Sequence, residues 1–167
     1  ASAVLALTGA EPMVWRIGDR DCLWHGDPLH WSERAPILFP VVGASADGRV
    51  RIGERFYPME RHGFARVQRF AIIESARDRV RLRLTANEGT RAHFPFGFRL
   101  DVEARLAPQS FSLGFQVTNE DEGDMPYALG FHPAFPWPFD GGAREDYEIE
   151  FEREESPDVP RITRDGL

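Results

Sequence analysis

The sequence predicts an all-β fold, a large antiparallel β-sandwich, because apolar side chains recur at every second position and no segment shows a sustained helical stripe. The clearest run is 96–106, where apolar residues alternate with Gly97 and charged residues. Pro108 then turns the chain into a second alternating run at 111–117, as in a long antiparallel hairpin. Residues 80–84 alternate with arginines on the opposite side, which indicates a half-buried strand followed by a turn at 87–89.

Shorter segments fit the same fold class. We expect strands at 4–7 and 13–17, a hairpin marked by Asp47-Gly48, and an edge strand at 147–151, where aromatic and aliphatic residues alternate with acids. Residues 34–43 form an apolar run framed by prolines, so this run can be buried but cannot be an uninterrupted helix.

Length and composition favour one soluble domain over residues 1–167. The chain has the size of an ordinary domain, and it has no run of about eighteen apolar residues that could cross a membrane. The first residues lack the basic start of a signal peptide, and the single cysteine, Cys22, allows no internal disulfide. We therefore expect a cytoplasmic protein with no membrane partner.

The charge pattern excludes several function classes. A net charge of -7 argues against a nucleic-acid partner, since proteins that bind phosphate backbones usually have a basic face. All 20 basic residues are arginine, so there is no lysine for a Schiff base, a P-loop or a lysine general base.

Two histidines stand in stretches that suit a binding site. His62 lies in 57–66, between arginines and directly before a glycine, and His132 lies in 129–137 among aromatic, glycine and proline residues. Imidazole titrates between pH 5 and 8, and a rigid apolar wall with a few polar groups is typical of ligand pockets. The first stretch by itself is more typical of a structural loop, and the presence of two favours a site.

Four motifs in order resemble the aldose 1-epimerase (galactose mutarotase-like) superfamily, in particular its branch related to glucose-6-phosphate 1-epimerases. They are LWHGD at 23–27 with Trp31, RAPILFPVVG at 34–43, RHGFAR at 61–66, and GFHPAF at 130–135 preceded by Asn119. The resemblance covers nearly the whole chain. It implies a β-sandwich with a sugar in a cleft across one sheet, and interconversion of the α and β anomers of a hexose or hexose phosphate.

The resemblance also implies residue roles. His132 would be the general acid on the ring oxygen, and His62 the second active-site histidine, which hydrogen-bonds the ring or the anomeric region. Arg34 and Arg66 would bind the substrate, through a guanidinium fork that suits a diol, carboxylate or phosphate. No metal and no cofactor is implied, and the partner would be a small sugar or sugar phosphate.

The family's catalytic base is a glutamate from the C-terminal part of a longer chain, beyond Leu167. We therefore expect a sandwich that is incomplete at its C-terminal end, after a polar tail from Glu154 broken by prolines. Glu33 and Glu60 are near the motifs, and we expect both to be exposed loop carboxylates.

Two other functions stay open on the sequence. A sandwich without its base would be a non-catalytic carbohydrate-binding or sugar-sensing module. The five histidines could instead serve a metal-dependent β-barrel enzyme, although no H-x-H or H-x-x-x-H pair is present. We expect Phe64, Phe135 and Trp137 to be core residues, with an apolar face toward a sugar ring as the alternative. The oligomeric state is left open.

Overall fold

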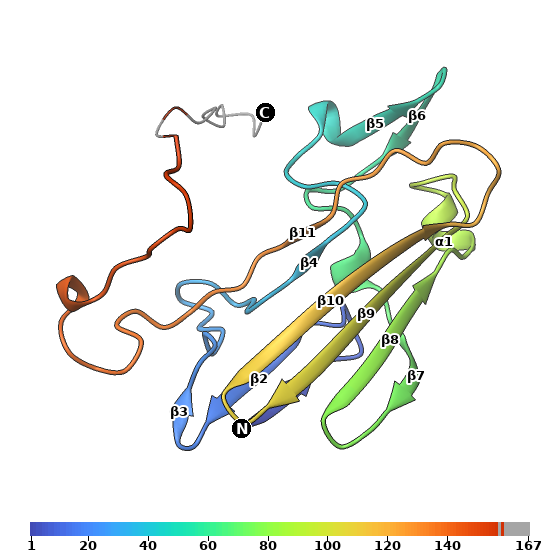
Figure 1. Ribbon diagram of the computed structural model, residues 1–167. Helices are drawn as coiled ribbons and strands as arrows, with labels where there is room; N and C mark the ends of the chain where they lie inside the picture. The colour runs from blue at the N-terminus through green and yellow to red at the C-terminus, as the bar shows by residue number, and fades with distance from the viewer. Residues whose placement is uncertain (157, 159–167) are drawn as a thin grey trace.

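A computed structural model describes residues 1–156 and 158, and strands make up nearly all of their regular structure (Figure 1). The large sheet has the order β10 (Ser110–Asn119), β9 (Phe98–Ala107), β8 (Arg79–Thr85) and β7 (Ala71–Ser75). A second sheet joins β1 (Ser2–Leu5), β2 (Pro12–Ile17) and β3 (Arg20–Asp21). Two pairs complete the set: β4 (Ile37–Leu38) with β11 (Gly130–Phe131), and β5 (Arg49–Ile52) with β6 (Arg55–Pro58).

All paired strands are antiparallel, so the predicted all-β fold is confirmed. The longest predicted hairpin is β9–β10, in which Phe98 pairs with Asn119 and Ala107 with Ser110. Helical structure in the described residues is limited to α1 (Glu88–Arg91) and the 3₁₀ turns η1 (Ala46–Gly48), η2 (Ala65–Val67) and η3 (Arg144–Asp146).

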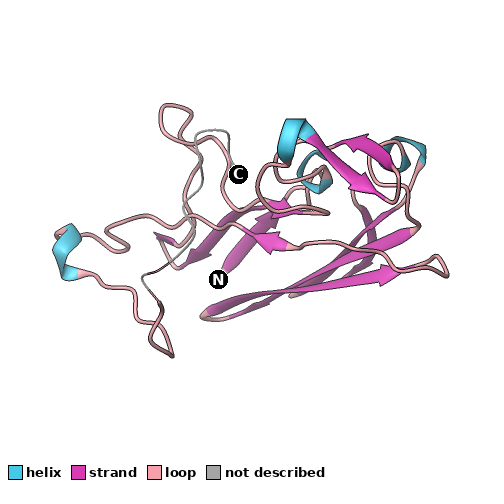
Figure 2. Cartoon of the chain, turned by 90° about the horizontal axis from the view of Figure 1, so that it is seen from above, coloured by secondary structure: helices cyan, strands magenta, loops and turns pink. Residues whose placement is uncertain are grey.

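The core lies between the large sheet and a second layer of strands and loops that packs on one of its faces. Seen from above, the large sheet forms one layer, and β11 and the three-stranded sheet form the other (Figure 2). Phe39, Phe98 and Leu100 are fully buried in the cluster that joins the two layers. This packing requires the inward side chains of β8 and β9 to be apolar, which is why the alternation in the sequence is so regular there.

Three sequence predictions were wrong in detail. Asp47-Gly48 is not the hairpin turn: it belongs to η1, and the β5–β6 turn comes later, at 53–54. No strand forms at 147–151, where Ile149 and Phe151 are 70% and 62% exposed, because alternation gives a strand only where a partner strand is available. The turn expected at 87–89 is the start of α1, capped by Asn87 and Thr90.

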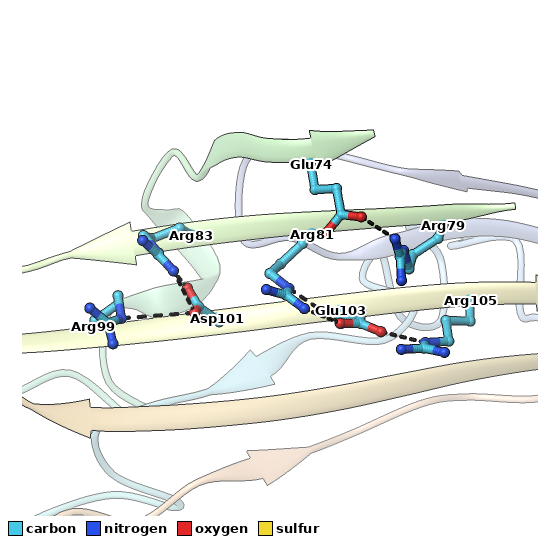
Figure 3. Close-up of polar contacts among 8 residues, drawn as sticks. All are labelled: Glu74, Arg79, Arg81, Arg83, Arg99, Asp101, Glu103 and Arg105. Atoms are coloured by element: carbon cyan, nitrogen blue, oxygen red, sulfur yellow. Dashed lines mark hydrogen bonds and ion pairs between the residues drawn. The ribbon is translucent and has the colours of Figure 1, made fainter. Parts of the chain in front are cut away.

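The outer face of the large sheet carries rows of ion pairs (Figure 3). Arg83 Nε and Nη2 donate to the two carboxylate oxygens of Asp101 at 2.6 and 2.8 Å, and Arg81 Nη2 donates to Glu103 at 2.7 Å. The Asp101 side chain is only 8% exposed, because the arginine stems cover it. The face is therefore charged but paired.

Of the tail expected from Glu154, residue 157 and residues 159–167 lie outside the described part of the chain. Within the described part, no helix is long and apolar enough to cross a membrane.

Candidate active site

The extended segment 34–40 lies between the two histidine motifs and is hydrogen-bonded to both. On one side it pairs with 128–134 through β4–β11 and three flanking backbone bonds: Ala134 N to Arg34 O (2.8 Å), His132 N to Pro36 O (3.1 Å) and Ala128 N to Pro40 O (2.8 Å). On the other side the N–H groups of Phe64 and Ala65 both donate to Phe39 O, at 3.0 and 3.1 Å. One segment thus holds both motifs, although seventy residues separate their histidines.

Gly63 makes the second contact possible. Its backbone has φ +71° and bridges to Phe39 in parallel. A Cβ atom at this position would overlap the Phe39 carbonyl and lie 2.7 Å from Pro40 N. Only glycine fits such a close backbone approach in a left-handed conformation.

His132 projects from the face of this segment that points away from the large sheet. Its neighbour Phe131 packs against Phe115 of β10, with ring centroids 5.7 Å apart, so Phe131 faces inward. Successive side chains of an extended strand point to opposite faces, which directs His132 outward. The imidazole is exposed and lies against Trp31, with ring centroids 5.2 Å apart and an interplanar angle of 58°.

His62 is held by a two-way contact with the backbone of Gly43. The His62 N–H donates to Gly43 O at 2.8 Å, and the Gly43 N–H donates to His62 Nδ1 at 3.1 Å. His62 has φ +70°, a left-handed conformation that costs a residue with a Cβ of the order of 1–3 kcal/mol and is concentrated at functional sites. The strained backbone fixes where the ring points.

The Gly43 bond also fixes the state of the ring. Because Nδ1 accepts a hydrogen bond, the neutral imidazole carries its proton on Nε2 and presents a donor on that side. Burial lowers the pKa of His62, and the charges of Arg61, Arg66 and His132 lower it further, while Glu33 acts in the opposite direction. His62 is therefore a neutral N–H donor near pH 7.

Arg66 and Glu33 form an ion pair beside His62. Arg66 lies in η2, and its Nη1 donates to Glu33 Oε1 at 2.7 Å, with the two side chains 24% and 34% exposed. Arg66 Nε is buried and has no hydrogen-bond partner among the described residues. Glu33 is thus a half-buried partner of Arg66 and not the exposed loop carboxylate that we expected; Glu60 is exposed.

Arg34 stands at the other end of the segment, next to the His132 motif. Its guanidinium rests against Gly26, where a Cβ atom would lie 2.8 Å from Cζ and Nη1. The carboxylate of Glu11 accepts the backbone N–H groups of Arg34 and Ala35 at 2.8 and 2.9 Å. The charges of Arg66, His132 and Glu33 reach His62, whereas Arg34 is not among the groups that shift its pKa.

The supporting residues carry little local signal in the sequence. Glu11, Glu33 and Gly43 act through contacts between segments distant in the chain, and no local pattern marks them. The expectation for the aromatic residues was correct for Phe64, which is buried, and wrong for Phe135 and Trp137, which are 51% and 39% exposed.

The larger cavities of the described chain lie elsewhere. One of about 410 Å³ is lined by apolar residues that include Val42, Ile52 and Tyr127, and one of about 390 Å³ lies on the charged face over β9 and β10. His62 and His132 line neither of these cavities; His132 is exposed and His62 is half-buried. Within the described residues, no three His, Cys, Asp or Glu side chains are grouped as metal ligands would be.

Comparison with known proteins decides the family. The family model described as aldose 1-epimerase matches residues 1–163. The chain belongs to the aldose 1-epimerase family. This result agrees with the all-β sandwich fold and with the resemblance carried by the sequence motifs.

Individual relatives give the same result. Protein LacX (plasmid) of Lactococcus lactis subsp. lactis is 38% identical over 146 residues, which are 83% of this chain and 49% of LacX. The crystal structure of a galactose mutarotase-like protein from Lactobacillus casei has a TM-score of 0.76 and 39% identity, over 80% of this chain and 46% of that protein. A galactose mutarotase related enzyme from Lactobacillus acidophilus has a TM-score of 0.80 and 30% identity, over 84% and 48%. The chain spans about half the length of these relatives.

Proposed function

We propose that this chain carries the acid side of an aldose 1-epimerase site, which interconverts the α and β anomers of a hexose or hexose phosphate. The observation that carries the proposal is the bridging of the two histidine motifs by one extended segment, with His132 bonded at Pro36 and the His62 motif at Phe39. Three residues of extended chain span about 10 Å, so the two bonding points lie about this far apart along the segment.

The reaction needs one acid and one base. A base takes the proton of the C1 hydroxyl, the electrons of that O–H bond form the C1 carbonyl, and the bond from C1 to the ring oxygen breaks. The electron pair of the broken bond goes to the ring oxygen, which takes a proton from the acid. Rotation about C1–C2 and the reverse steps then close the ring with the other configuration at C1.

The residues divide these tasks. His132 is the acid on the ring oxygen, since its ring is exposed and held from one side by Trp31. His62 donates from Nε2 to the ring or to the anomeric region, and its fixed tautomer suits it as a donor. Arg66 and Arg34 hold the sugar hydroxyls or a phosphate, as a guanidinium fork can.

The base, as the resemblance implies, is a glutamate from the C-terminal part of a longer chain. Among the described residues, Glu33 is the carboxylate whose charge acts on His62, and its Oε1 already accepts from Arg66. We propose that a protein of the relatives' length takes its base from the half that these 167 residues do not span. This same observation favours a second function for the chain by itself, the non-catalytic binding of sugar.

Polarimetry of fresh α-D-glucose, and a coupled assay for its 6-phosphate, test the proposal. In a protein of the relatives' length, His132→Ala should lower kcat about 10²- to 10⁴-fold and change KM much less, because the donated proton matters in the transition state. Arg66→Ala should mainly raise KM. His93→Ala is the matched control, since His93 bonds the Pro58 carbonyl and its charge does not act on His62.

Three results would count against the proposal. Equal rates for His132→Ala and the unmodified protein would remove His132 as the acid. If the 167-residue chain were as fast as the longer protein, a base within these residues would exist, and the division between the two halves would be wrong. Sugar binding without any mutarotation in the longer protein would identify a binding module.

A further inference from the structure

The ion pair between Glu33 and Arg66 joins two segments that are distant in the sequence. Glu33 directly precedes the extended segment 34–40, and Arg66 lies in η2 at the far side of Phe39. Their atoms Oε1 and Nη1 are 2.7 Å apart although 33 positions separate them in sequence. A pair of this geometry, with both side chains mostly covered, is more strongly coupled than an exposed pair.

One turn of the chain holds the backbones of both partners. The Glu11 carboxylate accepts the N–H groups of Arg34 and Ala35, next to Glu33. Gly9 donates its N–H to Gln68 O at 2.8 Å, and a Cβ atom on Gly9 would lie 2.7 Å from Arg66 O. Turn 9–11 therefore fixes both backbones, and forming the ion pair orders only the two side chains.

We propose that Glu33 is a positioning residue of the sugar site: its carboxylate holds the Arg66 guanidinium beside His62, so that the remaining N–H groups of the fork are oriented for the sugar. This inference rests on the proposed function. Glu33 does not touch the substrate and acts through Arg66.

The hydrogen bonds on Arg66 support this role. Among the described residues, the bond from Nη1 to Glu33 holds the guanidinium, and Nε is buried, so Nε is not one of the N–H groups left for a ligand. A guanidinium free to rotate would lose the fork geometry that two adjacent sugar oxygens require. Glu33 also supplies the negative charge near His62, where Arg61, Arg66 and His132 are positive when protonated. The carboxylate thus both orients the arginine and reduces the net positive charge around the imidazole.

The test compares Glu33→Ala, Glu33→Gln and Arg66→Ala singly, and Glu33→Ala with Arg66→Ala in one double variant. The variants are made in a protein of the relatives' length. Glucose and glucose 6-phosphate are the probes, with Kd from titration followed by NMR and KM and kcat from mutarotation. The control is Glu74→Ala, because Glu74 pairs with Arg79 on the large sheet (Figure 3) and its charge is not among those that shift the His62 pKa.

Glu33→Ala should raise Kd and KM roughly three- to tenfold with little change in kcat, and Glu33→Gln should recover part of the loss because its amide oxygen still accepts from Arg66. The double variant should be no weaker than Arg66→Ala alone. Glu74→Ala should change neither constant. Additive losses in the double variant, or an unchanged Kd in Glu33→Ala, would overturn the positioning role.

A separate measurement keeps this inference distinct from the proposed function. If the unmodified protein neither binds nor isomerises the two sugars, the proposed function fails. An NMR titration of His62 then tests separately whether the Glu33 carboxylate acts on the His62 environment. Removal of its charge in Glu33→Gln should lower the His62 pKa further, and Glu74→Gln should not move it. No change in Glu33→Gln would overturn the inference.

Discussion

Replacement of Gly63 by alanine tests how closely η2 and the His62 motif depend on the segment 34–40. The new Cβ atom meets the Phe39 carbonyl and the Pro40 nitrogen, which are backbone atoms and cannot turn aside. The residue also has to keep φ +71° to preserve the bridge to Phe39. Two separate costs therefore fall on this one position.

A matched control separates them. Gly18 has φ +61° in the β2–β3 turn, and a Cβ atom added there would have no other atom within 4 Å, so Gly18→Ala meets only the conformational cost. That cost is about 1–2 kcal/mol in the left-handed region. Overpacking typically adds about 1–3 kcal/mol, so Gly63→Ala should destabilise by about 2–5 kcal/mol in total.

Urea denaturation of both variants gives the free energies directly, and the difference between them should be about 1–3 kcal/mol. Thermal unfolding should show the same order, with Gly63→Ala about 2–12 °C below Gly18→Ala for a chain of this size. Sugar affinity should fall in Gly63→Ala and not in Gly18→Ala, because a displaced Gly63 moves His62. Equal destabilisation by the two variants would refute the close contact at Phe39.

Three other perturbations test contacts of the site and of the sheet. The pKa of His62 should lie below 6.5 in an NMR pH series. Because the unfolded chain then binds this proton more readily than the folded one, the free energy of unfolding should fall as pH drops from 6.5 toward the folded pKa. His62→Asn should flatten this part of the stability–pH curve. Glu11→Ala should cost about 2–3 kcal/mol in urea denaturation, because it leaves the N–H groups of Arg34 and Ala35 without their acceptor, and Glu11→Gln should cost less than half of that; equal costs would contradict the two bonds. Asp101→Ala should cost about 1–3 kcal/mol of stability by leaving Arg83 unpaired on the outer face of the large sheet. Asp124→Ala, at an exposed position, should change stability by no more than about 0.5 kcal/mol.

Alternation predicted β8, β9 and β10 of the large sheet because each of these strands has a more buried and a more solvated face, and it gave no prediction for the edge strand β7. Apart from Asp101, the fully buried positions of β8 and β9 are apolar, and Pro108 stands in the turn to β10 as expected. The same signal failed at 147–151, since an alternating sequence does not reveal whether a neighbouring strand exists to receive its hydrogen bonds. Periodicity reports burial on one face, and pairing depends on the rest of the chain.

The site was predictable to the level of motifs and not to the level of contacts. The motifs named His62, His132, Arg34 and Arg66, and their catalytic and binding roles stay predictions. The left-handed backbone of His62 and its bond from Gly43 depend on a loop 19 residues away, and no sequence period reports such a contact. The ion pair between Glu33 and Arg66 was missed for the same reason, because a carboxylate in a loop looks solvated until its partner is placed.

The segment 34–40 links the two histidine motifs in space. It is too short and too buried to bend independently, with Ile37 and Phe39 both fully covered. His132 is bonded at one end, at Pro36, and the His62 motif at the other, at Phe39. Any change that shifts this segment along its length therefore moves both histidines together and preserves their separation, whereas a change at Gly63 or Gly130 moves one motif against the other. Substitutions at Gly63 or Gly130 should therefore weaken sugar binding more than their loss of stability alone would predict. If the two histidines belonged to independent loops, sugar binding would fall only as far as stability does.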